Sequence, residues 1–206
     1  MEADIELLEA WRAGDARAGN DLLRRYFAAL HRFFAHKVDD EVEDLIQRTL
    51  LALVRSKHAI REATSFRAYL FTVARNELYH YLTARRRSRD ALDFGSVSVA
   101  DLGTSPTGMV ARRKDQALLL QALRGIPVEL QIALELHYWE GLTTAELATA
   151  LAVPQGTAKS MLRRAREQLE ARLRRGPRVA GDPQATLADL EAWARSIREA
   201  PRPGRS

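Results

Sequence analysis

Residues 141–175 constrain the fold of this chain more than any other stretch, because they contain a helix stop and a helix start within a few residues. Thr143 and Glu146 have the spacing of a capping box, which favours a helix that begins there. Residues 152–156 then break the apolar periodicity, and Pro154 suits only the start of a new helix. The stretch therefore predicts two helices joined by a tight turn.

The second of these helices, expected from Thr157, has one apolar stripe and a basic remainder. The stripe contains residues at spacings of three and four: Ala158, Met161, Leu162, Ala165 and Leu169. A short helix, a tight turn and a longer helix with a basic exposed face are typical of a helix-turn-helix, whose second helix enters the major groove of DNA. For this stretch alone, an ordinary helical hairpin with a solvated basic face remains the alternative.

Composition limits the class of protein. The hydrophobic fraction of 46% is enough for packed cores, and no apolar run approaches the roughly 18 residues of a membrane span. The acidic, amphipathic start of the chain does not resemble a signal peptide. The chain has no cysteine, which excludes disulfides and thiolate zinc sites. With a net charge of +5 and clustered arginines, we expect a cytoplasmic protein with a polyanionic partner and no membrane insertion.

Residues 4–36 predict two helices, and the second carries a broad apolar face that is expected in the core. That face consists of Leu22, Leu23, Tyr26, Phe27, Leu30, Phe33 and Phe34. His31 and His36 have no convincing ligand geometry and are expected at exposed helix positions.

A third helix is expected to begin at residues 39–41. Its apolar side contains Leu45, Ile46, Thr49, Leu50, Leu53 and Val54. The polar, partly acidic patch that remains contains Glu43, Asp44, Gln47 and Arg48. This patch is either a solvated helix start, with acids near the positive end of the helix dipole, or a docking face for another protein.

A polar loop over residues 57–64 leads to a fourth helix, which Ser65 can cap. Its apolar stripe contains Phe66, Leu70, Val73, Ala74 and Leu78. The other faces mix aromatic and basic residues: Tyr69, Arg75, Asn76, Tyr79, His80, Arg85, Arg86 and Arg87. Aromatics among arginines are typical of single-stranded nucleic acid binding, and a buried aromatic helix with a solvated basic end is the alternative.

The remaining segments complete an all-α fold of two small helical domains. We expect a first domain over residues 1–87, a flexible linker over 88–112, and a second domain over 113–176 that contains the helix-turn-helix. Residues 177–206 form a C-terminal extension with one amphipathic helix, which carries Trp193 and is expected to be an accessory helix.

Taken together in this order, the segments EDLIQRTLLALV, SFRAYLFTVARNELYHYLTARRR, LHYWEGLTTAELATAL and VPQGTAKSMLRRAREQL closely resemble sigma factors of the extracytoplasmic-function (ECF) group. The resemblance covers nearly everything from residue 5 to residue 175. It implies a subunit that binds core RNA polymerase through the clamp helices of the largest subunit and the flap, and that directs initiation at promoters. It also implies that an anti-sigma factor is a candidate partner.

The resemblance implies three sets of site residues. Those expected to bind core polymerase are Glu43, Asp44, Gln47, Arg48 and Leu50. Those expected to bind the melted −10 element are His58, Arg61, Ser65, Arg67, Tyr69, Arg75, Asn76, Tyr79, Arg85 and Arg86. Those expected at the −35 duplex are Thr143, Thr144, Gln155, Gly156, Thr157, Lys159, Ser160, Arg163, Arg164 and Arg166. Unstacked bases need aromatic and polar partners, whereas arginine and lysine suit a major groove.

The chain departs from the family pattern at three places. Arg48 stands where an acid is common, and Met161 stands where an arginine is usual, so one phosphate contact fewer is expected there. The extension after Gly176 lies outside the two-domain plan, and we treat a regulatory helix as a hypothesis. Thr49 could be a phosphorylation switch beside the docking face, although a structural helix threonine explains it more simply.

Two other classes of protein compete with a sigma factor. A stand-alone two-domain helix-turn-helix regulator would not need the patch around Asp44. An enzyme would need a site, and the Glu77–His80 pair has the spacing of a di-iron bundle without the second pair and further carboxylates that such a site requires. The sequence has no Gly-rich phosphate loop and no nucleophile elbow. We therefore expect no catalytic residue, no metal site and no cofactor.

Overall fold

The computed structural model describes residues 2–38, 40–60, 65–85, 92–103 and 114–175. These residues contain eight α-helices and no strand, apart from an isolated bridge between Ser98 and Pro127. The prediction of an all-α fold is therefore confirmed. No helix in these ranges is long and apolar enough to cross a membrane.

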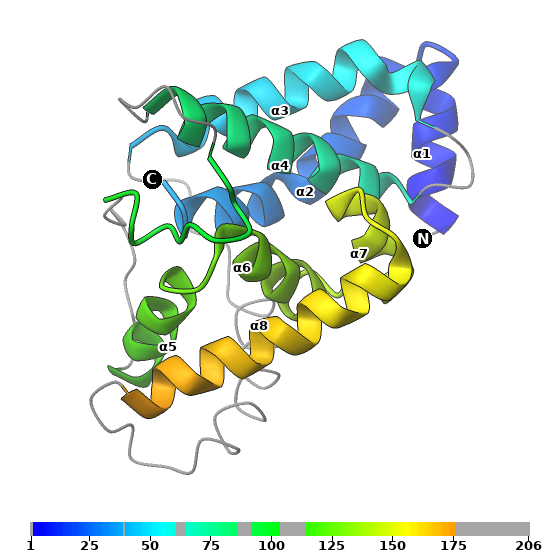
Figure 1. Cartoon of the computed structure of the whole chain (residues 1–206). Coiled ribbons are helices and arrows are strands. Elements are labelled where there is room, and N and C mark those ends of the chain that lie inside the picture. Colours follow the sequence, from blue (N-terminus) through cyan, green and yellow to red (C-terminus); the bar gives the residue numbers. More distant parts are fainter. Residues whose placement is uncertain (1, 39, 61–64, 86–91, 104–113, 176–206) are drawn as a thin grey trace.

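The first four helices form one group (Figure 1). They are α1 (Glu2–Arg12), α2 (Ala16–Ala35), α3 (Val42–Ser56) and α4 (Phe66–Arg85), with a 3-10 turn at Lys57–Ala59. Asp15 caps α2, because its carboxylate accepts hydrogen bonds from the backbone N–H groups of Arg17 and Ala18. The core of this group is rich in aromatic residues, and the Phe33 ring lies 5.1 Å from Phe34 and 5.7 Å from Phe71 between centroids.

The second group contains α5 (Lys114–Arg124), α6 (Val128–Leu134), a π-helical turn (Glu135–Trp139), α7 (Thr144–Leu151) and α8 (Gln155–Arg175). The predicted capping box at Thr143 and Glu146 is present at the start of α7. Ala152 ends α7 in the left-handed conformation (φ 55°), and α8 begins after Pro154. All five residues of the predicted apolar stripe on α8 are buried. The helix-turn-helix is therefore formed as the pattern predicts, with α8 beginning two residues earlier.

The two groups pack directly against each other. The helix α4 lies beside α7 (Figure 1), and the buried apolar residues of both groups form one continuous cluster. Residues 92–103, which we expected to belong to a flexible linker, pack into this structure instead. Val99 is fully buried, and the backbone N–H of Val128 donates to the carbonyl of Val97 at 2.9 Å. The glycine, serine and aspartate residues of this segment suggested a linker, but Val99 is buried and Leu92, Phe94 and Leu102 pack against the core.

Several burial predictions in the first group were wrong. Phe27, which we expected in the core, and Val54, which we expected on the apolar side of its helix, are 48% and 45% exposed. Both lie at the edge of a stripe that is wider than the surface its helix buries. His36, which we expected to be exposed, is 9% exposed because it lies under the second group. The expected C-terminal helix lies outside the described residues.

Candidate nucleic-acid and protein interfaces

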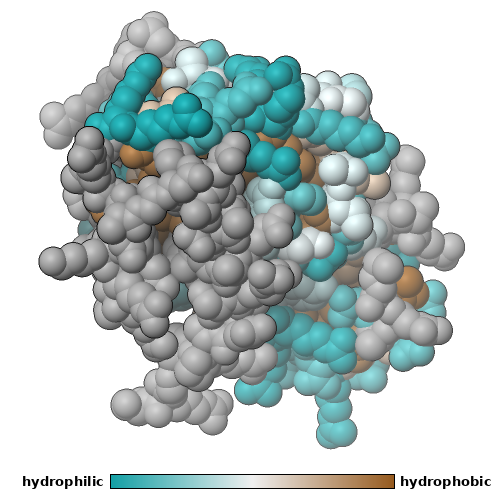
Figure 2. Space-filling model, turned by 90° about the horizontal axis from the view of Figure 1, so that it is seen from below, coloured by the Kyte–Doolittle hydropathy of each residue, from teal (hydrophilic) through white to brown (hydrophobic). Residues whose placement is uncertain are grey.

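The exposed face of α8 carries the basic side chains of the helix-turn-helix. Lys159, Arg163, Arg164 and Arg166 are exposed, and within the described part of the chain Lys159 and Arg164 have no ion pair. Arg163 pairs with Glu167 one turn further along, at 3.0 Å, and Arg166 lies 5.2 Å from the centroid of the Tyr138 ring. Figure 2 views the molecule from below, and the surface that is not grey is mostly hydrophilic. The exposed lysine and arginine side chains of α8 suit a polyanionic ligand.

The turn before α8 holds the start of that helix in place. Gln155 donates to the Thr144 hydroxyl at 3.3 Å, and Ser160 donates to the carbonyl of Thr157 at 2.8 Å. A Cβ atom added at Gly156 would meet no atom within 4 Å, so the backbone of the first turn is accessible from outside. Thr143 and Thr157 are also exposed. The residues expected at a DNA duplex thus lie together around the first turns of α8.

A second exposed surface lies on α3 and combines polar and apolar side chains. Asp44 and Arg48 form an ion pair at 2.6 Å between half-exposed side chains. Glu43 and Gln47 are exposed and Leu50 is half-buried. Leu51, which sequence reasoning missed, is 50% exposed beside Val54. Its position four residues after Gln47 places it on the same helix face and could have identified it.

The third set of residues, on α4, is engaged by the second helical group. The Arg67 guanidinium donates to the Glu146 carboxylate at 2.9 and 3.1 Å and to the carbonyls of Glu140 and Gly141 at 3.1 and 3.3 Å. Arg75, which we expected on a polar face, is 9% exposed and donates to the carbonyl of Ala150 at 2.9 Å. The α4 face is therefore not an open binding surface in this structure.

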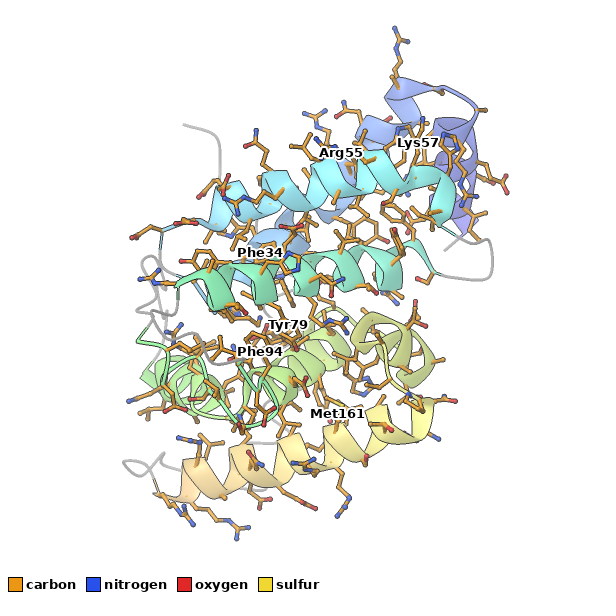
Figure 3. The ribbon with its side chains drawn as sticks, turned by 45° about the horizontal axis from the view of Figure 1, so that its top comes forward. Phe34, Arg55, Lys57, Tyr79, Phe94 and Met161 are labelled. Carbon is orange, nitrogen blue, oxygen red and sulfur yellow. The ribbon has the colours of Figure 1, made fainter. Side chains whose placement is uncertain are left out.

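Tyr79 is also covered, because the packed segment that follows α4 lies over it. Its ring stacks on Phe94 with centroids 4.0 Å apart and an angle of 7° between the planes (Figure 3). Burial raises the pKa of the Tyr79 phenol, with a further contribution from Glu129. An aromatic ring on α4 thus holds a stacking partner of the kind that an unpaired base would provide.

The other residues expected to bind the −10 element are distributed around these contacts. Arg85 donates to the Tyr81 hydroxyl at 2.6 Å at the other end of α4. Ser65 and Tyr69 are half-buried, and His58 and Asn76 are exposed. Arg61 and Arg86 lie outside the described residues.

Sequence reasoning missed a cluster of charges between the end of α2 and the π-helical turn. Lys37 forms a buried ion pair with Glu135, and Arg32 forms a bidentate pair with Glu140 at 3.0 Å. Burial raises the pKa of Glu135, but Lys37 and His36 outweigh it, so that the pKa lies below its ordinary value. Burial raises the pKa of Glu140, and Arg32 offsets this only in part. The sequence shows two basic residues at 36–37 and two acids at 135 and 140, but it does not show that these residues contact each other.

The described part of the chain holds no group of three or more histidine or carboxylate side chains that could hold a metal ion. His80 of the Glu77–His80 pair is exposed.

Comparison with protein families gives two matches, in the order of the two helical groups. Residues 20–88 match Sigma-70 region 2, and residues 116–169 match Sigma-70, region 4. The first range contains α3 and α4, and the second contains the helix-turn-helix.

Relatives and solved structures agree with these matches. The RNA polymerase sigma-H factor of Pseudomonas aeruginosa is 29% identical over 84% of this chain and 95% of its own length. The ECF RNA polymerase sigma-E factors of Haemophilus influenzae and Escherichia coli K12 are 26% and 24% identical over 82% and 81% of this chain, and over 95% and 92% of their own lengths.

Two structures share the fold. CnrH, solved with the cytosolic domain of CnrY, superposes with a TM-score of 0.64 at 22% identity over 85% of this chain and 99% of CnrH. RpoE of Bartonella quintana, solved with the anti-sigma factor NepR, gives a TM-score of 0.58 at 26% identity over 75% of this chain and 96% of RpoE.

Two packed helical groups, with a basic helix-turn-helix in the second, define a helical DNA-binding protein. Since both sigma regions match in the order of these groups, the chain belongs to the sigma-70 family, within the ECF group of RNA polymerase sigma factors. It therefore directs promoter-specific transcription, and a stand-alone regulator is not favoured.

Proposed function

We propose that this sigma factor uses its three surfaces for three separate contacts during initiation. The α3 surface binds the clamp helices of the largest polymerase subunit, α4 holds melted −10 DNA, and the start of α8 binds the −35 duplex. The open basic face around Lys159 and Arg164, at the start of a helix-turn-helix, is the single observation that carries this proposal. In this account the protein has no catalytic residue of its own, and the flap of the polymerase supports the second helical group.

The α3 contact is supported by the composition of its surface. An exposed mixture of Asp44, Gln47, Leu51 and Val54 on one helix is what a protein partner with both charged and apolar side chains requires. The Asp44–Arg48 pair is exposed enough that its free energy is small, so either side chain can exchange its partner for one on polymerase.

The α8 contact is supported by charge and geometry. Lys159, Ser160, Arg163 and Arg164 lie on the first turns of a helix that can enter a major groove, and arginine can donate to guanine O6 and N7 together. Gln155, Gly156 and Thr157 are exposed at the start of the helix, where its dipole favours negative charge, and in this proposal they contact phosphates.

An anti-sigma factor is a further proposed partner. Bartonella quintana RpoE, whose fold this chain shares, was solved with the anti-sigma factor NepR. That structure supports the proposal that a protein of this fold can be held by a second chain, and it identifies no particular partner here.

In-vitro transcription with core RNA polymerase, on DNA from upstream of the gene itself, tests the proposed function. We expect specific initiation that depends on this protein and that Asp44→Arg abolishes. Arg164→Ala should weaken binding of the upstream duplex about tenfold to a hundredfold, as loss of one bidentate base contact does. Glu9→Arg on α1 and Arg174→Ala at the end of α8 are matched controls, since both residues are exposed and lie outside the proposed contacts.

Binding of the DNA without polymerase-dependent initiation would contradict the proposal and favour a stand-alone regulator. Equal loss of activity in the Arg164→Ala variant and its Arg174→Ala control would contradict the assignment of the −35 contact to the start of α8.

A further inference from the structure

The Lys37–Glu135 ion pair joins the two helical groups at a point that water does not reach. The side chains of Lys37 and Glu135 are 0% and 2% exposed. Lys37 also donates to the carbonyl of Phe33 at 2.7 Å, and Gln131 donates to Glu135 at 2.8 Å. Two buried charges are tolerated only while they remain paired. Separation of the two helical groups would therefore leave each charge without its partner.

Further contacts surround this pair and connect the same two groups. Arg32 of α2 binds Glu140, and Arg124 at the end of α5 donates to the carbonyl of His36 at 2.8 Å. The ring of His36 lies 5.1 Å from that of Trp139 between centroids. Glu135 and Trp139 both belong to the π-helical turn, a distortion that is frequent at functional sites. The π-helical turn of the second group thus contacts the end of α2 through both residues.

A second set of contacts closes the face of α4. Besides Arg67 and Arg75, Thr72 donates to the carbonyl of Thr149 on α7 at 3.3 Å. Four backbone carbonyls of the second group accept from this face, namely those of Glu140, Gly141, Thr149 and Ala150. Carbonyl and carboxylate oxygens accept hydrogen bonds from arginine, as the phosphate oxygens and base edges of DNA do, so the second group occupies donors of α4 that a nucleic acid could use.

We propose that the free chain holds itself in a closed resting state, in which its own α7 and the loop before it cover the −10-binding face of α4 and the Lys37–Glu135 pair acts as the lock. The inference rests on the proposed function, because it assigns a regulation to the same α4 surface. Closure needs no second protein chain. Core polymerase and promoter DNA open the molecule because they bind the separated groups and not the closed ones.

A distance measurement between the two groups tests the lock directly. The chain has no cysteine, so Asn20→Cys on α2 and Ala171→Cys on α8, both at exposed positions, give two unique labelling sites. Pulsed electron spin resonance on the full-length doubly labelled protein should give one narrow distance distribution for the free chain. Addition of core polymerase should shift the distribution to longer distances.

Substitutions of the buried pair give the decisive comparison. Lys37→Met leaves the buried Glu135 carboxylate without its lysine, and should raise the ratio of open to closed molecules about a hundredfold to a thousandfold. The double variant Lys37→Met/Glu135→Gln removes both charges and keeps the amide contact to Gln131, so it should return to the distance of the wild type. Arg25→Met is the matched control, because it breaks an exposed ion pair with Asp4 inside the first group and should leave the distance unchanged.

The proposal is contradicted if the free wild-type chain gives a broad distribution of distances. It is also contradicted if the single and double variants give the same distance. Circular dichroism verifies that each variant is folded. If Lys37→Met loses helix content, Arg32→Ala replaces it and should still lengthen the distance, since Arg32 lies at the rim of the same contact. Polymerase and promoter are absent from the variant comparison, so its failure leaves the proposed sigma activity untouched, and the reverse also holds.

Discussion

At the scale of single residues, Gly19 shows how closely α1 and α2 approach each other. A Cβ atom at this position would lie 2.4 Å from two atoms of the Trp11 ring. The indole is buried and rigid, so it cannot move aside as the end of a flexible side chain would.

We therefore predict that Gly19→Ala destabilises the protein by about 1–3 kcal/mol, the usual cost of overpacking a core. Urea unfolding followed by circular dichroism measures the change. Gly156→Ala is the control, because an added Cβ has open space there and should stabilise the helix by about 0.4–1 kcal/mol through the unfolded chain. Equal effects of the two substitutions would contradict the assignment to Trp11.

Residue-level prediction from the sequence succeeded where a side chain acts within its own helix. The Thr143–Glu146 capping box and the stripe on α8 depend only on spacing, and both are present. The burial of His36 and Arg75 depends on a second group of helices that arrives from far along the chain. The residues next to His36 and Arg75 in the sequence do not indicate this second group. Both residues were therefore predicted on polar surfaces.

At the scale of elements, the cap of α7 links local stability to the contact with α4. Thr143 and Glu146 satisfy each other's backbone N–H groups, and the Glu146 carboxylate also binds Arg67. Thr143→Ala removes one cap bond and frees the carboxylate to move. A single helix start therefore contributes to the fold and to the closed face of α4.

For Thr143→Ala we expect a loss of about 1 kcal/mol of stability, the typical cost of removing a threonine N-cap. Thermal unfolding followed by circular dichroism detects it. Thr149→Ala on the exposed side of the same helix is the comparison, and it should be neutral or slightly stabilising because alanine is the better helix former. A larger loss at Thr149 than at Thr143 would be incompatible with a capping role.

The helices themselves were predictable because apolar spacing sets them, and the segment between the groups was not. Residues 92–103 are rich in small and polar residues, which is typical of a mobile linker. They are instead fixed by Val99 in the core and by Phe94 on Tyr79. The apolar side chains of this segment follow no single helical or strand periodicity, so only the folded partner surface reveals their role. The three sets of contact residues came from the family resemblance and stay predictions.

At the scale of the whole molecule, the stability of the closed form depends on pH through Glu135 and Glu140. The pKa of Glu135 is lowered and that of Glu140 is raised, so their contributions change with pH in opposite directions. The pKa of Glu135 is lowered by Lys37 and His36 against the effect of burial, so its stabilisation is present above its ordinary value of 4.5 and is lost as the pH falls through the lowered value. Burial raises the pKa of Glu140, so its contribution is complete below 4.5 and is lost as the pH rises through the raised value.

We predict that the contribution of Glu135 to stability falls as the pH drops below 4.5, and that the contribution of Glu140 falls as the pH rises above 4.5. Thermal unfolding midpoints from about pH 3 to about pH 8 give the profile. Glu140→Gln removes the carboxylate that titrates on the neutral side, so this variant should lose less stability than the wild type as the pH rises. Profiles of identical shape for the two proteins would show that Glu140 does not contribute.

Arg67 has a consequence for how this chain can change over evolution. Under the proposed function, the same guanidinium binds Glu146 in the closed molecule and promoter DNA in the open one. A substitution of Arg67 selected for a different promoter would also alter the fraction of closed molecules. A substitution selected for a more stable closed state would in turn alter promoter preference. Specificity and basal activity therefore cannot drift independently at this position, and a compensating change at Glu146 is the shortest route by which descendants of this gene could separate the two traits.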